Sequence, residues 1–358
     1  MSYCWKRKQW LVLRGVVMLG ATIWMVEGEP QVPCIFIFGD SLSDNGNNHA
    51  LPTSAKANYF PYGIDFPGGK PTGRFTNGLN SVDFITQFLG FDKLIPPFAN
   101  TAADISKGVN YASGAAGIRN ETGKHLGSDI NLGLQLTNHR TTVSQISAGL
   151  NKSSEKVEQL LNKCLYYVNI GSNDYLNNYF LPQYYPTSTS FTLDHYASDL
   201  IRQYSHIIRS LYDIGGRKFV LVGMGYIGST PRALTTLETN SSVDDINKAA
   251  FIFNSNLKSQ VDRFNKALPN ASFIFINSTV SKVDPSLGFK VLDSGCCQVG
   301  ENGQCVANAR PFENRKDFVF FDSFHPTEAV NLLIAISSYN ASIPGFTYPM
   351  NISQLVRS

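Results

Sequence analysis

The sequence VPCIFIF at residues 32–38 runs directly into GDSLSDNGNN at residues 39–48. A short β-branched and aromatic run of this kind predicts a buried strand, and the turn that follows brings Ser41 to the strand's carboxyl end. In open α/β sheets the ligand-binding and catalytic groups gather at that end. Gly, Asp and Asn are also ordinary turn residues, so this stretch alone leaves a plain turn open.

The rest of the chain repeats the rhythm of strand and helix. Strands are expected at 108–112, 164–170, 218–222, 272–276 and 318–321, and helices at 81–89, 131–150, 152–161, 196–211, 246–268 and 329–339. Such alternation predicts a mostly parallel sheet covered by helices on both faces, with right-handed crossovers. Because no linker, charge run or internal repeat marks a boundary, we expect one α/β domain over 29–358.

The first 28 residues have the pattern of a cleaved secretory signal. Four basic residues between positions 6 and 14 precede the apolar stretch 15–26, and small residues follow where a signal peptidase cuts. An uncleaved anchor helix is the alternative, but the apolar stretch is shorter than the roughly 18 residues that span a bilayer. We therefore expect a secreted, extracellular protein without stable membrane insertion.

Composition indicates a globular protein, because apolar residues make up 43% and charged residues 16% of the chain. Of the 30 Lys and Arg residues and the 27 Asp and Glu residues, four and one lie in 1–28, which leaves 26 of each. The mature chain is thus close to neutral. That balance gives no support for a nucleic-acid partner.

Cysteine usage fits an oxidising compartment. Cys4 leaves with the signal, and an odd number remains, so at least one thiol is unpaired within the chain. The remaining cysteines are Cys34, Cys164, Cys296, Cys297 and Cys305. A short bridge to Cys305 is expected in the Gly-rich loop, and Cys34 and Cys164 open two apolar runs that can face each other on neighbouring strands. A zinc site is disfavoured, because no Cys-x-x-Cys pair or nearby histidine completes one.

Seven Asn-x-Ser/Thr sequons suit a secreted surface. Asn277 ends a predicted strand and is expected to stay unmodified. The glycosylation candidates are Asn120, Asn151, Asn240, Asn270, Asn340 and Asn351.

A second polar cluster, DSFH at residues 322–325, stands before the helix at 329–339. Pro326 suits a first helical turn, so His325 is expected at the start of that helix with Asp322 three residues before it. A serine nucleophile needs a nearby base, and the base needs a carboxylate that holds its tautomer. Ser41, His325 and Asp322 can fill these roles. The plain alternative for His325 is a structural histidine at a helix terminus.

Acyl transfer also needs donors for the developing oxyanion. Candidates are the backbone N–H groups of Ser41 and Gly114 and the side-chain amide of Asn173, each at the end of a different predicted strand. Turn formation by Asn173 and close packing at Gly114 are the structural alternatives. The pattern Gly-x-Ser-x-Gly is not matched around Ser41, which argues against an α/β-hydrolase elbow.

Four blocks in order carry a family resemblance: GDSL with DNGNN, the Gly114 turn, GSND at 171–174 and DSFH at 322–325. They resemble the blocks of the SGNH hydrolases, and the arrangement is similar to the plant GDSL esterase/lipase branch. The resemblance covers nearly the whole chain after the signal, and it implies that the secreted protein resides in the cell wall or apoplast. It implies a flavodoxin-like three-layer α/β/α fold, no metal and no organic cofactor.

Residue by residue, the resemblance implies Ser41 as nucleophile, Gly114 and Asn173 as oxyanion donors, and Asp322 with His325 as the rest of the triad. One departure is Phe312, where relatives carry a cysteine just before Asn-Arg. The missing partner leaves Cys296 or Cys297 unassigned. The triad is not affected.

We therefore expect a secreted serine carboxyl-ester hydrolase acting on lipid or other small-molecule acyl esters. An acyltransferase, a polysaccharide O-deacetylase and a catalytically silent binding protein on the same scaffold are the alternatives. The long loop 48–80, rich in Pro, Gly and aromatic residues, is expected over the serine. Within it, Arg74 either binds a substrate carboxylate or holds the loop.

Overall fold

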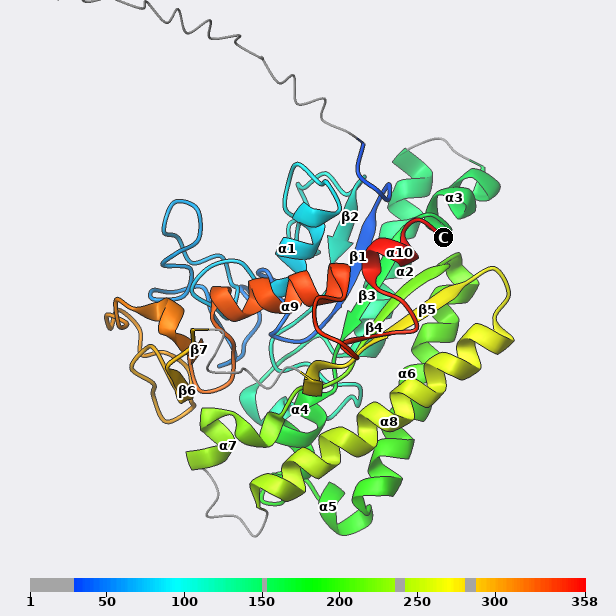
Figure 1. Cartoon of the computed structure of the whole chain (residues 1–358). Coiled ribbons are helices and arrows are strands. Elements are labelled where there is room, and N and C mark those ends of the chain that lie inside the picture. Colours follow the sequence, from blue (N-terminus) through cyan, green and yellow to red (C-terminus); the bar gives the residue numbers. More distant parts are fainter. Residues whose placement is uncertain (1–28, 150–152, 236–241, 281–287) are drawn as a thin grey trace, which may run out of the picture.

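The computed structural model describes residues 29–149, 153–235, 242–280 and 288–358. The expected signal at 1–28 and the sequons at Asn151 and Asn240 lie outside this part of the chain. Within it, the main sheet has six strands in the order β2-β1-β3-β4-β5-β8, all parallel to their neighbours except β8 (Figure 1). The strands are β1 (Ile35–Gly39), β2 (Gly108–Asn110), β3 (Leu165–Asn169), β4 (Lys218–Val222), β5 (Ser272–Ile276) and β8 (Thr347–Tyr348).

Helices cover both faces of this sheet, as Figure 1 shows. The helices of the described residues are α1 (Ser81–Phe88), α2 (Leu132–Gly149), α3 (Ser154–Leu161), α4 (Ser172–Asp174), α5 (Thr187–Ser190), α6 (Leu193–Ile214), α7 (Pro231–Thr235), α8 (Val243–Ala267), α9 (Glu328–Asn340) and α10 (Ile352–Leu355). One core lies between the sheet and α2, α6 and α8, and the other lies between the sheet and α1, α9 and α10.

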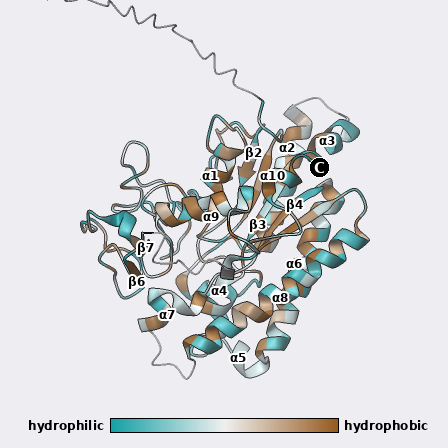
Figure 2. Cartoon of the chain, viewed as in Figure 1, coloured by the Kyte–Doolittle hydropathy of each residue, from teal (hydrophilic) through white to brown (hydrophobic). Residues whose placement is uncertain are grey.

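Successive side chains along each strand point to opposite faces of the sheet, which explains why there are two cores. Phe36 and Phe38 of β1 point to the α6 side, whereas Ile35 and Ile37 point to the α9 side. Figure 2 shows the apolar colour concentrated in the strands and hydrophilic colour along the outer sides of α6 and α8. Strands buried on both faces are typical of parallel sheets. The expected three-layer α/β/α fold with a mostly parallel sheet is confirmed.

The strand order creates a crevice at one end of the sheet. The chain passes from β1 to β2 on one side and then returns to β3 on the other side of β1. At such a switch point the connections diverge to opposite faces, which leaves room beyond the carboxyl ends of the strands. The segments after β1 and β3, which carry Ser41 and Asn173, open there.

Two short elements differ from the expectation. The strand expected at 318–321 is β7 (Phe318–Phe320), which pairs with β6 (Val291–Gly295) in a separate small sheet. The main sheet is instead closed by the antiparallel β8. A two-residue strand has no periodic signal in the sequence, so only pairing with β5 reveals it.

Disulfides join cysteines of neighbouring segments. Cys34 and Cys164 are bonded, with Cα atoms 4.8 Å apart at the starts of β1 and β3. Cys297 and Cys305 form a second bridge across eight residues. Cys296 is a buried free thiol.

The described sequons differ in accessibility. Asn120, Asn270 and Asn340 are exposed. Asn351 is buried, and its Oδ1 accepts a hydrogen bond from Gln354 N at 2.9 Å as the N-cap of α10. That side chain has a structural role, so Asn351 does not fit the expected glycosylation.

No helix among the described residues is long and apolar enough to cross a membrane.

Candidate active site

The turn after β1 presents Ser41 at the carboxyl end of the strand. Asp40 N donates to Asn169 O of β3 at 3.2 Å, and Asp40 Oδ1 accepts from Leu42 N at 3.0 Å. At Gly39, a Cβ would lie 2.6 Å from Asn169 O, so only glycine allows this close approach of β1 to β3. Ser41 is half-buried and lines a cavity.

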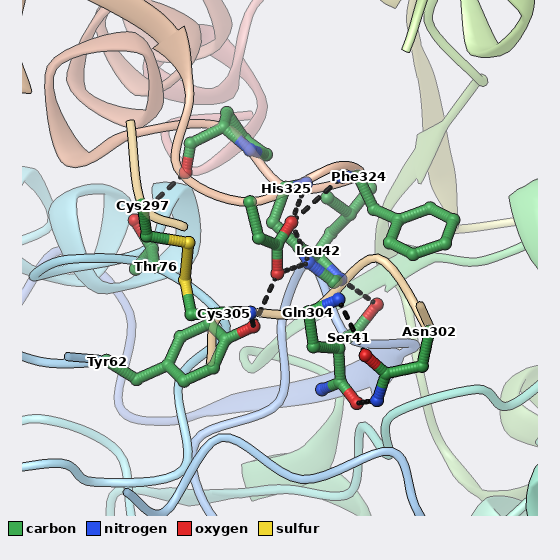
Figure 3. Close-up of polar contacts among 12 residues, drawn as sticks. Ser41, Leu42, Tyr62, Thr76, Cys297, Asn302, Gln304, Cys305, Phe324 and His325 are labelled. Atoms are coloured by element: carbon green, nitrogen blue, oxygen red, sulfur yellow. Dashed lines mark hydrogen bonds and ion pairs between the residues drawn. A yellow bond between two sulfur atoms is a disulfide. The ribbon is translucent and has the colours of Figure 1, made fainter. Parts of the chain in front are cut away.

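Ser41, His325 and Asp322 form a continuous hydrogen-bond chain, and Figure 3 shows the imidazole of His325 directed at Ser41. His325 Nε2 lies 2.7 Å from Ser41 Oγ, and His325 Nδ1 lies 2.8 Å from Asp322 Oδ2. An ionised carboxylate only accepts, so Nδ1 carries the proton toward Asp322 and Nε2 is left to accept from the serine hydroxyl. The three expected triad residues are therefore brought together, although 284 positions separate Ser41 from His325.

Hydrogen bonds between backbone N–H groups and nearby oxygen atoms hold the turn at 322–325 in place. Phe324 N and His325 N both donate to Asp322 Oδ1 at 2.8 Å, and Phe321 N donates to His325 O at 2.7 Å. Helix α9 begins at Glu328, one residue before the expected start at 329, and Pro326 lies ahead of the helix in an antiparallel bridge with Phe320. The imidazole is thus positioned by a tight turn before the helix.

Asn173 reaches the same cavity from the short helix α4, which follows β3. Its Nδ2 donates to Ala116 O at 3.0 Å, and its Oδ1 accepts from Asn177 Nδ2 at 2.6 Å. These two bonds fix the orientation of the amide and leave one of its N–H groups without an acceptor among the described residues. Sequence reasoning missed Asn177, whose only signal is its four-residue spacing from Asn173 in a helical turn.

Gly114 is engaged elsewhere. Its N–H donates to Asp44 Oδ2 at 2.9 Å, and a Cβ at Gly114 would lie 2.6 Å from the ring of Phe75. Gly114 is therefore packed too closely against Phe75 to carry a side chain, as the structural alternative for this residue predicted. Its neighbour Ala115 lines the cavity with φ of 67°, and within the described residues its N–H has no acceptor.

Three buried aspartates brace the loops of the site. Desolvation raises the pKa of Asp40 to about 7 and raises the pKa values of Asp44 and Asp174 to about 6. Asp44 and Asp174 each accept hydrogen bonds from backbone N–H groups. Asp40 Oδ2 is buried without a hydrogen-bond partner among the described residues.

The loop 48–80, which was expected over the serine, packs against His325 and Asp322. The ring of Phe75 lies 4.9 Å from that of His325, and Tyr62 donates to Asp322 Oδ2 at 2.6 Å. Arg74 forms a buried, two-bond ion pair with Asp83 of α1, at 2.6 and 2.8 Å. Arg74 therefore holds its loop to α1 and does not present its charge to a substrate.

A cavity of about 1040 Å³ opens beside Ser41, His325 and Asn173. Most of its walls are apolar side chains, among them Leu176, Phe180, Leu181, Met224, Ile227, Phe320, Phe324, Val330 and Ile334. Polar side chains line it beside Ser41 and also farther away, for example at Gln183, Thr230 and Asn302. Within the described part of the chain, no group of three or more His, Cys, Asp or Glu side chains is placed to hold a metal ion.

The model of the GDSL-like lipase/acylhydrolase family matches residues 35–337. The chain belongs to this family. A GDSL esterase/lipase of Arabidopsis thaliana is 46% identical over 359 residues, which cover 98% of this chain and 98% of that relative. Two others from the same plant are 47% identical (98% of each chain) and 48% identical (92% of this chain, 94% of the relative). As a GDSL esterase/lipase family member, the chain is a carboxylic ester hydrolase.

Proposed function

We propose that this ester hydrolase is a secreted serine esterase or lipase that works through Ser41, His325 and Asp322. The observation that supports the proposal most directly is the hydrogen-bond chain from Asp322 through His325 to Ser41 Oγ. A serine hydroxyl is a weak nucleophile until a neighbouring base takes its proton. Burial of Asp322 and its bond to His325 keep the base in the required tautomer.

Each half of the reaction uses the same three residues. Ser41 Oγ attacks the ester carbonyl while His325 Nε2 takes its proton, and Asp322 stabilises the imidazolium. Collapse of the tetrahedral intermediate expels the alcohol, which receives that proton and leaves Ser41 acylated. Water then attacks the acyl-enzyme with His325 as the base, and the acid is released.

The oxyanion of each tetrahedral intermediate needs N–H donors that are not already engaged. Ser41 N–H has no acceptor among the described residues, and Asn173 Nδ2 keeps one free N–H. The turn at Gly114 and Ala115 supplies the third donor. Because Asp44 holds the Gly114 N–H, we assign this role to Ala115 N–H, and Gly114 can serve only if Asp44 releases it.

The cavity supports a lipid-like acyl ester as the substrate. A volume of about 1040 Å³ with apolar walls accommodates a long acyl chain, whereas a glycan needs polar partners along its length. This lining favours lipid or other acyl esters over polysaccharide O-acetyl groups. An alcohol in place of water would resolve the same acyl-enzyme as an acyl transfer.

A hydrolysis panel tests the proposal. Purified protein would be assayed on p-nitrophenyl esters of increasing acyl length beside an acetylated glycan, with and without an alcohol acceptor. We expect kcat/KM to rise with acyl length, and Ser41→Ala to lose at least about 10³-fold in kcat while it stays folded. Near-wild-type turnover in a folded Ser41→Ala protein would overturn the triad. If the wild-type protein hydrolysed no ester, a catalytically silent binding protein would be favoured. If it acted on the acetylated glycan alone, a polysaccharide O-deacetylase would be favoured.

Export is the second part of the proposal. The Cys34–Cys164 and Cys297–Cys305 bridges support maturation in an oxidising compartment. We expect the full-length chain, expressed in plant cells, to reach the apoplast and to start near residue 29. N-terminal sequencing of the extracellular protein tests this, and retention of residues 1–28 would point to an anchor.

A further inference from the structure

Asp322 receives hydrogen bonds from two different parts of the chain. Its own turn provides Phe324 N, His325 N and His325 Nδ1. The remaining donor is Tyr62, whose hydroxyl lies 2.6 Å from Asp322 Oδ2 although 260 positions separate the two residues. Oδ2 is the same oxygen that approaches His325 Nδ1 most closely, at 2.8 Å. His325 Nδ1 also lies 2.9 Å from Oδ1, so Tyr62 bonds one of the two carboxylate oxygens that face the imidazole.

The direction of the Tyr62 hydroxyl is set by a second bond. Cys305 N donates to Tyr62 Oη at 3.2 Å, so the single hydroxyl proton is left for Asp322. The side chain is fully buried, with its ring 5.5 Å from that of Phe321. Burial and the charge of Asp322 raise the pKa of Tyr62 well above its usual range, which keeps it a donor at every working pH.

Cys305 is itself held in place by the Cys297–Cys305 bridge, which lies beside Tyr62 in Figure 3. Tyr59 adds a contact to the same segment, because its hydroxyl donates to Cys305 O at 2.9 Å. Two tyrosines of one loop therefore bond the same residue. One of them also bonds the triad acid.

We infer that Tyr62 is a positioning residue of the catalytic machinery, oriented by the disulfide-closed segment 297–305. The inference rests on the proposed triad of Ser41, His325 and Asp322. The hydroxyl holds Oδ2 toward His325 Nδ1 and spreads part of the carboxylate charge, so the imidazole is oriented and its protonated form is less strongly favoured. Hydrogen bonds to a buried charge are strong enough for both effects.

The decisive experiment compares Tyr62→Phe with Tyr59→Phe. Both changes remove one hydroxyl bonded to Cys305 and keep the ring, but only the first removes a donor to Asp322. For Tyr62→Phe we expect kcat to fall roughly tenfold with KM nearly unchanged. The acidic limb of the kcat/KM profile should also move to higher pH, because the carboxylate left with more charge favours the imidazolium. Tyr59→Phe should keep the wild-type profile.

Other titratable groups near the Asp322 and His325 pair are Asp40, Tyr59 and Cys296. All three remain in Tyr62→Phe, so a shift of the limb between wild type and this variant reports the lost hydroxyl. A fall in kcat without a shift of the limb would mean that Tyr62 only packs, and would overturn the inference. Equal shifts in both tyrosine variants would overturn it as well.

A second substitution covers the case in which Tyr62→Phe does not fold. Incorporation of 3-fluorotyrosine at position 62 keeps the ring and hydroxyl but makes the proton more acidic and the donor stronger. The acidic limb should then move to lower pH, and an unmoved limb would overturn the inference. Ser41→Ala distinguishes failure of the proposed triad from failure of this inference. If the folded Ser41→Ala protein is active, the triad itself is wrong. If it is inactive and Tyr62→Phe behaves like wild type, only the positioning role of Tyr62 is wrong.

Discussion

At the scale of single residues, the site depends on which N–H and O–H groups are already engaged. Asn173 has its oxygen bonded by Asn177 and one N–H bonded by Ala116, so a single N–H remains for a substrate oxygen. Gly114 has its only N–H bonded by Asp44. Donors that are fixed in advance need no reorganisation when charge develops in the transition state.

Removal of the Asn173 amide should therefore act mainly on kcat. Asn173→Ala is expected to lower kcat by roughly 10²- to 10³-fold with little change in KM, as for loss of a single oxyanion donor. Asn177→Ala, which removes only the orienting bond, should show a smaller fall in the same direction. Steady-state kinetics on one p-nitrophenyl ester measures both. A sharp rise in KM at constant kcat would make Asn173 a substrate-binding residue instead.

At the scale of elements, the parallel strands β1 and β3 are linked by a disulfide at their amino ends, and the residues that follow their carboxyl ends contribute to the candidate site. Cys34 and Cys164 stand just before β1 and β3, and Ser41 and Asn173 follow the same strands. Leu165 N also donates to Cys34 O at 3.0 Å, so the bridge continues the ladder between the strands. The bridge closes a long loop and lies far from the reacting groups.

The double variant Cys34→Ala with Cys164→Ala should reduce stability more than turnover. A bridge over 130 positions restricts the unfolded chain strongly, and its removal is expected to cost about 2–5 kcal/mol of unfolding free energy. Denaturant unfolding of the purified variant measures the loss. At a temperature where the variant remains folded, kcat should stay within a few-fold of wild type. A large loss of kcat in the folded variant would show that the bridge also positions Ser41 and Asn173.

At the scale of the whole molecule, the carboxyl ends of the strands collect several buried carboxyl groups. Asp40, Asp44 and Asp174 all have pKa values raised by desolvation. A carboxyl group with a raised pKa binds its proton more tightly in the folded than in the unfolded chain. Its contribution to stability is full below its ordinary pKa and is lost as pH rises through the folded pKa.

Asp40 offers a test of this pH dependence, because its folded pKa is about 7 and its Oδ2 has no bonding partner among the described residues. Asp40→Asn cannot ionise, so the Tm difference between variant and wild type should grow in favour of the variant as pH rises from about 4 to about 8. Differential scanning calorimetry across that range measures it. Tm curves that run parallel would show that burial of Asp40 does not disfavour its ionised form.

From the sequence alone, the order of the main strands and helices and a set of candidate reactive groups could be predicted. Apolar periodicity located β1, β3, β4 and β5 closely, because strands buried on both faces must be almost wholly apolar. Local motifs likewise indicated Ser41 and the turn that joins Asp322 to His325. The tertiary structure decided what depends on contacts between distant segments: the bond of Tyr62 to Asp322, the engagement of Gly114 by Asp44 and the pairing of β8 with β5. A hydrogen bond between residues far apart leaves no periodic trace in either segment, so only folding, which brings them within 3 Å, reveals it.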